Sequence, residues 1–241
     1  MDGVPSHCDR RRVSAPLLTV YWRQQTMLHW RYPARAVQPL LPQGLVVDEF
    51  DGSAWVSLTP LVMACAQGLG LVPLPRHTFL ETNLRTYVRL DNGDSGLWFF
   101  SLDVTTPLML TARAVGVPYQ LADLSFTTDG VDRRHTGRRR HGDATYELTV
   151  RQGGFIDQAP LDKWLTCRWA AYTHHAGRLW QTRVQHEPWR FRRGAILTMK
   201  QSLTHAAGLE PPQTEPLVHT SPGVGPVRIG WPHPVTGPKG A

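Results

Sequence analysis

Apolar and polar side chains alternate at every second position along much of the chain. Runs with this two-residue period are rich in β-branched and aromatic residues, as is typical of strands. They span residues 54–63, 79–90, 97–104, 121–128, 144–151 and 182–191. Asn92-Gly93 separates the second run from the third and predicts a hairpin, because both residues tolerate a positive φ.

Helical spacing is confined to two segments. Residues 34–41 allow two turns. Residues 160–175 place apolar side chains three and four positions apart, with Pro160 suited to the first turn and Gly177 to the end. Many short strands with one longer helix predict a mainly β fold with a minor helical part, in which one antiparallel sheet closes into a barrel.

The domain boundaries follow from where the alternating pattern starts and stops. No linker is long enough to divide the chain, so we expect one barrel domain over residues 15–231. We expect the Arg-containing start, residues 1–14, to form a flexible arm, and the Pro- and Gly-containing end, residues 232–241, to form a flexible tail.

The composition limits the function classes. The 241 residues carry 26 basic and 19 acidic side chains, a net charge of +7, and 41% are apolar, which is typical of a soluble globular chain. No run approaches the roughly 18 apolar residues of a membrane helix, so we expect no membrane partner. Cys8, Cys65 and Cys167 lack metal-ligand spacing and indicate reduced thiols of a cytoplasmic protein without a metal or other cofactor.

Much of the positive charge lies in one segment. Residues 132–143 contain five Arg and two Asp, follow the turn dipeptide Asp129-Gly130, and include no aromatic residue. A nucleic-acid groove usually combines basic and aromatic side chains, so we expect a solvated hairpin tip and no nucleic-acid partner. Polyanion binding through Arg133–Arg140 stays open as a weaker alternative.

The run at 79–90 carries an unusual row of polar residues. Because side chains alternate across a strand, Glu81, Asn83 and Arg85 share one face, and the other face is largely apolar. The row lies either in solvent or inside a barrel, where Glu81 and an arginine would satisfy each other. The next run, 97–104, is apolar on both faces, which favours the second arrangement.

Seven runs in a fixed order resemble the YqjF-like family of uncharacterised bacterial proteins, part of the acetoacetate decarboxylase-like superfamily. They read HWRYPARAVQPLLPQGL (29–45), FDGSAWVSLTPLVM (50–63), FLETNLRTYV (79–88), GLWFFSLDV (96–104), TARAVGVPYQLADL (111–124), WLTCRWAAY (164–172) and VQHEPW (184–189). The resemblance implies a single antiparallel β-barrel around a small-molecule cavity.

The resemblance also implies site residues. In acetoacetate decarboxylases an aromatic-x-Glu segment supplies an active-site glutamate, which matches Glu81 in Phe79-Leu80-Glu81. A Gly-Arg-Glu segment and a Tyr-Pro-Lys-Lys segment hold the Schiff-base lysine, and they match the stretches of Arg113 and of Tyr119-Gln120. Both lysines are therefore missing, and an imine needs an amine, so we expect no Schiff-base decarboxylation. The family's Tyr-Arg matches His29-Trp30, and its His-Glu-Ala-Trp matches the segment that starts at His186.

The candidate pocket combines residues indicated by the alternating pattern with residues implied by the resemblance. Glu81 as general base, Tyr119 as proton donor and Arg113 as a clamp for a carboxylate or enolate are the catalytic candidates. The substrate-binding candidates are Asn83, Arg85, His29, Trp30 and Asp103. With two arginines against one carboxylate, we expect the partner to be a small anionic molecule.

The sequence leaves two function classes open. The first is an acid–base enzyme acting on a small oxo acid without a lysine, and the second is a barrel that binds such a compound without reaction. A buried Glu–Arg pair with a purely structural role is the competing interpretation of the pocket. A homo-oligomer is also left open.

Overall fold

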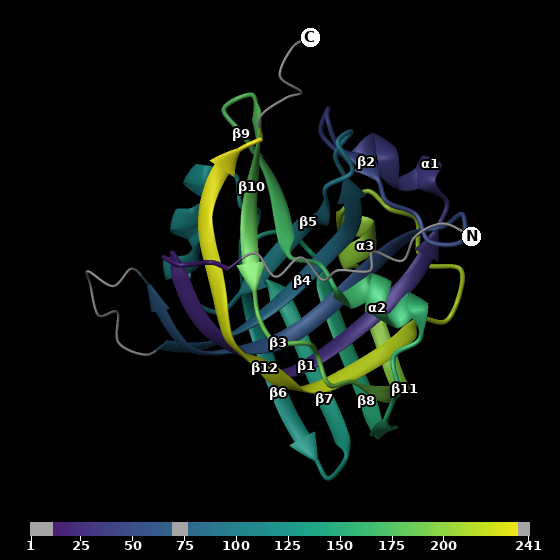
Figure 1. Cartoon of the computed structure of the whole chain (residues 1–241). Coiled ribbons are helices and arrows are strands. Elements are labelled where there is room, and N and C mark those ends of the chain that lie inside the picture. Colours follow the sequence, from purple (N-terminus) through teal and green to yellow (C-terminus); the bar gives the residue numbers. More distant parts are fainter. Residues whose placement is uncertain (1–11, 69–76, 236–241) are drawn as a thin grey trace.

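The computed structural model describes residues 12–68 and 77–235, and strands dominate it (Figure 1). The strands are β1 (Leu18–Tyr32), β2 (Val46–Val47), β3 (Ala54–Gly68), β4 (His77–Arg89), β5 (Ser95–Val104), β6 (Tyr119–Asp129), β7 (Asp132–Arg139), β8 (Thr145–Phe155), β9 (Ala170–His175), β10 (Arg178–Gln185), β11 (Arg192–Gln201) and β12 (Leu217–Pro234). The helical elements are short: α1 (Ala34–Val37), η1 (Gln38–Leu40), η2 (Pro107–Val115), α2 (Pro160–Thr166) and α3 (Leu203–Ala206). None of the helices in the described residues has the length and apolar character that a membrane span requires.

The twelve strands form one sheet that closes on itself twice. The order β5-β6-β7-β8-β11-β12-β1-β3-β4 returns to β5 and makes a large ring. The order β5-β9-β10-β12-β1-β3-β4 also returns to β5 and makes a small ring. The two rings share β1, β3, β4, β5 and β12. In Figure 1, β9 and β10 stand at the top, β6, β7 and β8 at the bottom, and the curved β12 reaches both groups.

The long shared strands serve the two rings with different halves. In β12, Thr220 pairs with β11, whereas Ile229 pairs with β10. In β5, Leu97 pairs with β9 and Leu102 pairs with β6. The pairings of β5 with β6 and with β9 are parallel, whereas its pairing with β4 is antiparallel. The expected wholly antiparallel sheet is therefore wrong in this part, although the mainly β fold is confirmed.

The alternation along β4 divides its side chains between the two rings. Thr82 and Leu84 face the large ring, where the Thr82 Oγ1 lies 2.6 Å from the Tyr146 hydroxyl and Leu84 joins the core with Leu148. The side chains at the alternate positions of β4 face the small ring. Phe79 is one of them and belongs to the apolar cluster there. A single strand therefore lines two separate interiors.

Two expected elements need correction. The helix expected over 160–175 ends at Thr166, and Ala170–His175 form β9, because they pair along β10 through a turn with positive φ at Ala176 and Gly177. This tertiary pairing overrides the local helical spacing. The strand expected at 182–191 is β10, which starts earlier and ends at Gln185.

The expected arm and tail also differ from the structure in part. Val13 is buried, and its backbone N–H donates to the Gln185 Oε1 over 2.9 Å. At the other end, β12 continues to Pro234 and pairs there with Trp180. The rest of the expected arm and tail, residues 1–11 and 236–241, lies outside the described residues.

Candidate functional site

Glu81, Asn83 and Arg85, here called the polar row, lie in the middle of the shared sheet. On neighbouring strands the row is flanked by the pairs Leu61 and Val104, Thr59 and Leu102, and Ser57 and Phe99. Glu81 is 4% exposed and Asn83 is 8% exposed. The expectation that these two residues are buried rather than in solvent is confirmed. The polar row faces the small ring because it alternates with Thr82 and Leu84.

Glu81 is a buried carboxyl group without an ionic partner in residues 12–68 and 77–235. Burial raises the pKa of Glu81 from its ordinary value to about 7, although hydrogen bonds from Asn83 and Tyr119 act in the opposite direction. Its Oε2 has no hydrogen-bond partner among the described residues. The expected hydrogen bond between Glu81 and an arginine is wrong, since an amide and a phenol take that place. A carboxyl group in this environment exchanges a proton near neutral pH.

Tyr119 stands opposite Glu81 at the start of β6. It is buried, and desolvation together with the nearby Glu81 raises the pKa of Tyr119 well above its ordinary value. The phenol therefore keeps its proton at neutral pH and acts as a donor toward Glu81. The structure brings together these two of the three expected catalytic side chains.

Arg85 is a cation held inside the sheet. Its Nε is enclosed and has no hydrogen-bond partner in residues 12–68 and 77–235, while the side chain as a whole keeps partial exposure. Burial lowers the pKa of Arg85, the neighbouring Tyr87 hydroxyl opposes that effect, and the charge of Arg168 adds to it. The guanidinium thus points into the small ring without a carboxylate of the described chain to neutralise it.

His29 joins the polar row through a hydrogen-bonded chain that the sequence did not reveal. Its Nδ1 lies 2.7 Å from the Ser57 Oγ, which in turn lies 2.7 Å from the Tyr87 hydroxyl. Burial and the charges of His219 and Arg85 lower the pKa of His29 well below its ordinary value, so the ring is neutral. The Nδ1 is engaged by Ser57, whereas the Nε2 has no hydrogen-bond partner within the described part of the chain.

A second histidine, His219 of β12, packs against His29. The two ring centroids are 5.2 Å apart, and the His219 Nε2 lies 2.8 Å from the Asp162 Oδ1 on α2. The sequence analysis missed His219, Asp162, Ser57 and Tyr87. A signal for His219 was present, because it interrupts the apolar start of β12, but its partner lies 57 positions away.

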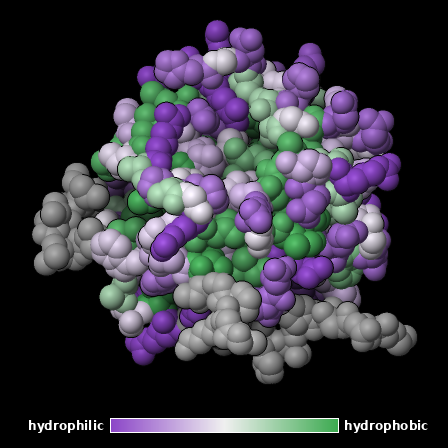
Figure 2. All heavy atoms as spheres, turned by 90° about the horizontal axis from the view of Figure 1, so that it is seen from above, coloured by the Kyte–Doolittle hydropathy of each residue, from purple (hydrophilic) through white to green (hydrophobic). Residues whose placement is uncertain are grey.

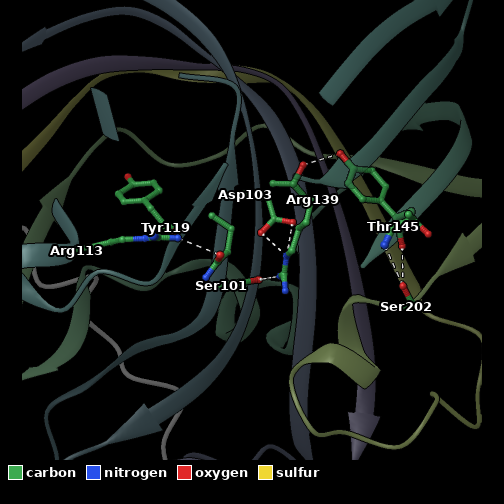
Figure 3. Close-up of polar contacts among 10 residues, drawn as sticks. Ser101, Asp103, Arg113, Tyr119, Arg139, Thr145 and Ser202 are labelled. Atoms are coloured by element: carbon green, nitrogen blue, oxygen red, sulfur yellow. Dashed lines mark hydrogen bonds and ion pairs between the residues drawn. The ribbon is translucent and has the colours of Figure 1, made fainter. Parts of the chain in front are cut away.

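Arg113 does not reach the polar row. It lies in the last turn of the 3-10 segment η2. Its exposed side chain donates from Nε to the backbone carbonyl of Tyr119 over 2.6 Å and from Nη2 to the Gln120 Oε1 over 3.0 Å (Figure 3). The expectation that Arg113 clamps a ligand beside Glu81 is therefore wrong. Arg113 holds the backbone of Tyr119 from outside.

Asp103 and Trp30 also lie elsewhere, because their positions alternate with the residues that face the small ring. Asp103 points into the large ring, where the Arg139 Nε lies 3.0 Å from both carboxylate oxygens and the Arg139 Nη2 lies 2.6 Å from the Ser101 Oγ (Figure 3). Trp30 is fully buried in the apolar core of the large ring. The sequence analysis grouped both residues with His29 as substrate-binding candidates, and for these two residues that expectation is wrong.

The basic segment is a strand and not a hairpin tip. Residues 132–139 form β7 between β6 and β8. Arg133 is buried and donates to the carbonyls of Gln25 and Ser221. Other arginines of the segment pair with carboxylates: Arg134 with Glu147, Arg139 with Asp103, and Arg140 with Asp123. Most of the arginines of this segment are therefore paired with carboxylates or carbonyls of the same chain.

A cavity of about 300 Å³ lies at the end of β10, beside β12. Its lining consists of Trp169, Val184, Gln185, His186, Glu187, Pro188, Pro226 and Arg228. Burial lowers the pKa of His186 to about 4, and the charge of Arg85 contributes to the lowering. Figure 2 views the molecule from the end that carries β9 and β10, where apolar side chains gather in the middle of a polar surface. In the described residues no three His, Cys, Asp or Glu side chains are placed to hold a metal ion.

Comparison with known sequences gives a family and one curated relative. The DUF2071 family, described as an uncharacterized conserved protein, matches residues 19–225. The uncharacterized protein YqjF of Bacillus subtilis (strain 168) is 28% identical over 221 residues, which cover 87% of this chain and 91% of that protein.

Comparison with solved structures gives acetoacetate decarboxylase-like neighbours. The enduracididine biosynthesis enzyme MppR with HEPES buffer bound has a TM-score of 0.66 at 15% identity, covering 98% of each chain. MppR complexed with pyruvate has a TM-score of 0.64 at 16% identity, covering 96% of each chain. Acetoacetate decarboxylase from Legionella pneumophila has a TM-score of 0.66 at 13% identity, covering 98% of this chain and 96% of that one. At these identities the likeness establishes the fold alone.

Proposed function

The chain belongs to the DUF2071 family of uncharacterised conserved proteins with an acetoacetate decarboxylase-like fold, and on that premise we propose that it binds a small anionic oxo acid at the polar row and moves a proton on it. The observation that carries this proposal is Arg85, a guanidinium inside the sheet with no carboxylate partner in the described chain. A buried charge without a counter-charge costs free energy, and the carboxylate of a ligand offsets that cost through a two-pronged hydrogen bond.

Glu81 supplies the chemistry in this proposal. A carboxyl group with a pKa of about 7 is present in both protonation states at neutral pH, which is what a general acid or base requires. Asn83 separates Glu81 from Arg85 on the same face of β4, and in this proposal the two long side chains converge on one ligand, with its carboxylate at Arg85 and its carbonyl and the adjoining carbon at Glu81. Glu81 then removes a proton from the carbon beside the carbonyl, and the Tyr119 hydroxyl supports the resulting charge as a hydrogen-bond donor.

The resemblance to acetoacetate decarboxylases argues against an imine mechanism. Tyr119 and Gln120 occupy the positions of the two lysines in the decarboxylase pattern, and neither side chain forms an imine. Lys163 on α2 and Lys200 on β11 are exposed. Support for the ligand class comes from MppR, a protein of the same fold that was solved with pyruvate, a 2-oxo acid.

The first test is ligand-induced stabilisation with pyruvate. We expect pyruvate to raise the melting temperature of the wild type and of Arg113→Met, a matched variant outside the polar row, but not that of Arg85→Met. At a ligand concentration of about 100 times Kd the stabilisation is about 2.7 kcal/mol, which raises the melting temperature by about 5–11 °C. Pyruvamide, which lacks the charge, is expected to give no shift. An equal response of Arg85→Met and the wild type to pyruvate would contradict the proposal.

The second test is exchange of the pyruvate methyl protons in deuterated water, followed by NMR. We expect the wild type to accelerate exchange over buffer and Glu81→Gln to lose the acceleration, because glutamine does not accept the proton. Borohydride added during the reaction is expected to trap no adduct on a lysine, and mass spectrometry checks this. If pyruvate binds through Arg85 but no exchange occurs, the protein is a binding protein without acid–base chemistry. A trapped lysine adduct would establish the imine route instead.

A further inference from the structure

Two aromatic rings, those of Trp169 and His186, line the cavity beside β10, and the Trp189 and Trp22 rings pack against His186. The His186 ring lies 4.4 Å from the Trp169 ring, 5.2 Å from the Trp189 ring and 5.4 Å from the Trp22 ring, measured between centroids. Because burial keeps His186 neutral, its ring acts here as a flat aromatic wall and not as a cation. Walls of this kind favour a planar apolar group.

Two contacts connect the cavity to the interior of the small ring. Val184 lines the cavity and also packs against the apolar cluster that contains Leu102, Val104 and Tyr119, which surround Glu81. From the same interior, the charge of Arg85 reaches His186. The cavity and the interior of the small ring thus adjoin each other at Val184.

We propose that the natural ligand is an aromatic 2-oxo acid, whose ring lies in the cavity between Trp169, Val184 and His186 while its carboxylate binds Arg85. This inference rests on the function proposed above and narrows its substrate class. A cavity of about 300 Å³ is at the lower end of the range for sites that bury a ring-containing ligand, and a three-carbon oxo acid leaves most of it unfilled. Pyruvate therefore binds through its head group alone, and an aryl group adds contacts with the cavity wall.

The experiment is calorimetric titration with phenylpyruvate and pyruvate as probes. We expect the wild type to bind phenylpyruvate at least about tenfold more tightly than pyruvate, because each methylene-sized apolar contact is worth that much or more. Val184→Trp fills the cavity and is expected to remove the advantage of phenylpyruvate while leaving pyruvate binding unchanged. Trp231→Leu, which changes an exposed tryptophan of β12, is the matched control and should retain the advantage.

The outcomes separate the inference from the function on which it rests. Equal affinity of the wild type for both acids, or an advantage of phenylpyruvate that survives in Val184→Trp, would overturn the aromatic ligand while leaving the oxo acid site intact. If Arg85→Met still binds both acids as the wild type does, the oxo acid site itself is wrong. If Val184→Trp does not fold, Trp169→Leu removes one wall of the cavity from the opposite side and is expected to give the same contrast.

Discussion

Replacing Glu81 with glutamine is expected to stabilise the protein at about pH 8 by about 3 kcal/mol, because each pKa unit is worth about 1.4 kcal/mol. Burial raises the pKa of Glu81 from 4.5 to about 7, so the folded protein binds a proton that the unfolded chain has released over this range. The wild type therefore loses stability as the pH rises from 4.5 to about 7, and the loss is complete above that value. Below pH 4.5 the two proteins should be equally stable, since the carboxyl group is then protonated in both states.

Denaturant unfolding at a series of pH values measures this effect as the difference between variant and wild type. The lowered pKa values of the buried histidines make both proteins less stable in acid. Because this contribution is the same in both proteins, it cancels in the difference between their free energies of unfolding. Glu49→Gln, at an exposed position, is the control and should stay within about 0.5 kcal/mol of the wild type. A flat difference for Glu81→Gln across the series would mean that the carboxyl group is not desolvated.

Asp103→Ala is expected to cost about 3–5 kcal/mol of unfolding free energy, because it leaves the Arg139 guanidinium charged and unpaired in the large ring. The side chains of Arg139 and Asp103 are 12% and 3% exposed, so water replaces little of the lost interaction. The combined change Asp103→Leu with Arg139→Met removes both charges and should recover most of the loss.

The exposed pair of Asp123 with Arg140 gives the comparison for this experiment. Asp123→Ala breaks a pair with side chains 65% and 51% exposed, and we expect it to cost at most about 1 kcal/mol. Urea unfolding of the four proteins measures all the terms. If Asp103→Ala costs no more than Asp123→Ala, the buried pair does not hold the large ring together.

The alternation of residue types predicted the burial of the polar row because that signal is local. Glu81 and Asn83 share a face whatever the strand pairs with, and the apolar hairpin partner indicated that both faces are covered. The family resemblance added the approach of Tyr119 to Glu81, which lie 38 positions apart and which no periodicity connects.

Predictions from residue type alone gave wrong locations for several arginine side chains. A run of arginines predicts a solvated segment, yet Arg133 and Arg139 are buried because carbonyls and a carboxylate from β1, β12 and β5 meet them. Arg113 matched a motif in sequence, but the 3-10 geometry of η2 directs its side chain outward. The burial of an arginine depends on partners supplied by distant strands, and a single sequence does not contain that information.

Because β4 belongs to both rings, its register determines which of its side chains face each interior. Between Leu84 and Arg85 the pairing with β5 shifts by one residue, so that Ser101 and Phe99 meet consecutive positions of β4. Inserting or deleting one residue in β4 would reverse which side chains face each interior from that point on, directing polar side chains of the row into the apolar core and Leu84 into the small ring. Divergence within this segment must therefore proceed by substitution at constant length. The loops between strands are free to change in length, so relatives are expected to differ there and to keep the spacing of this strand.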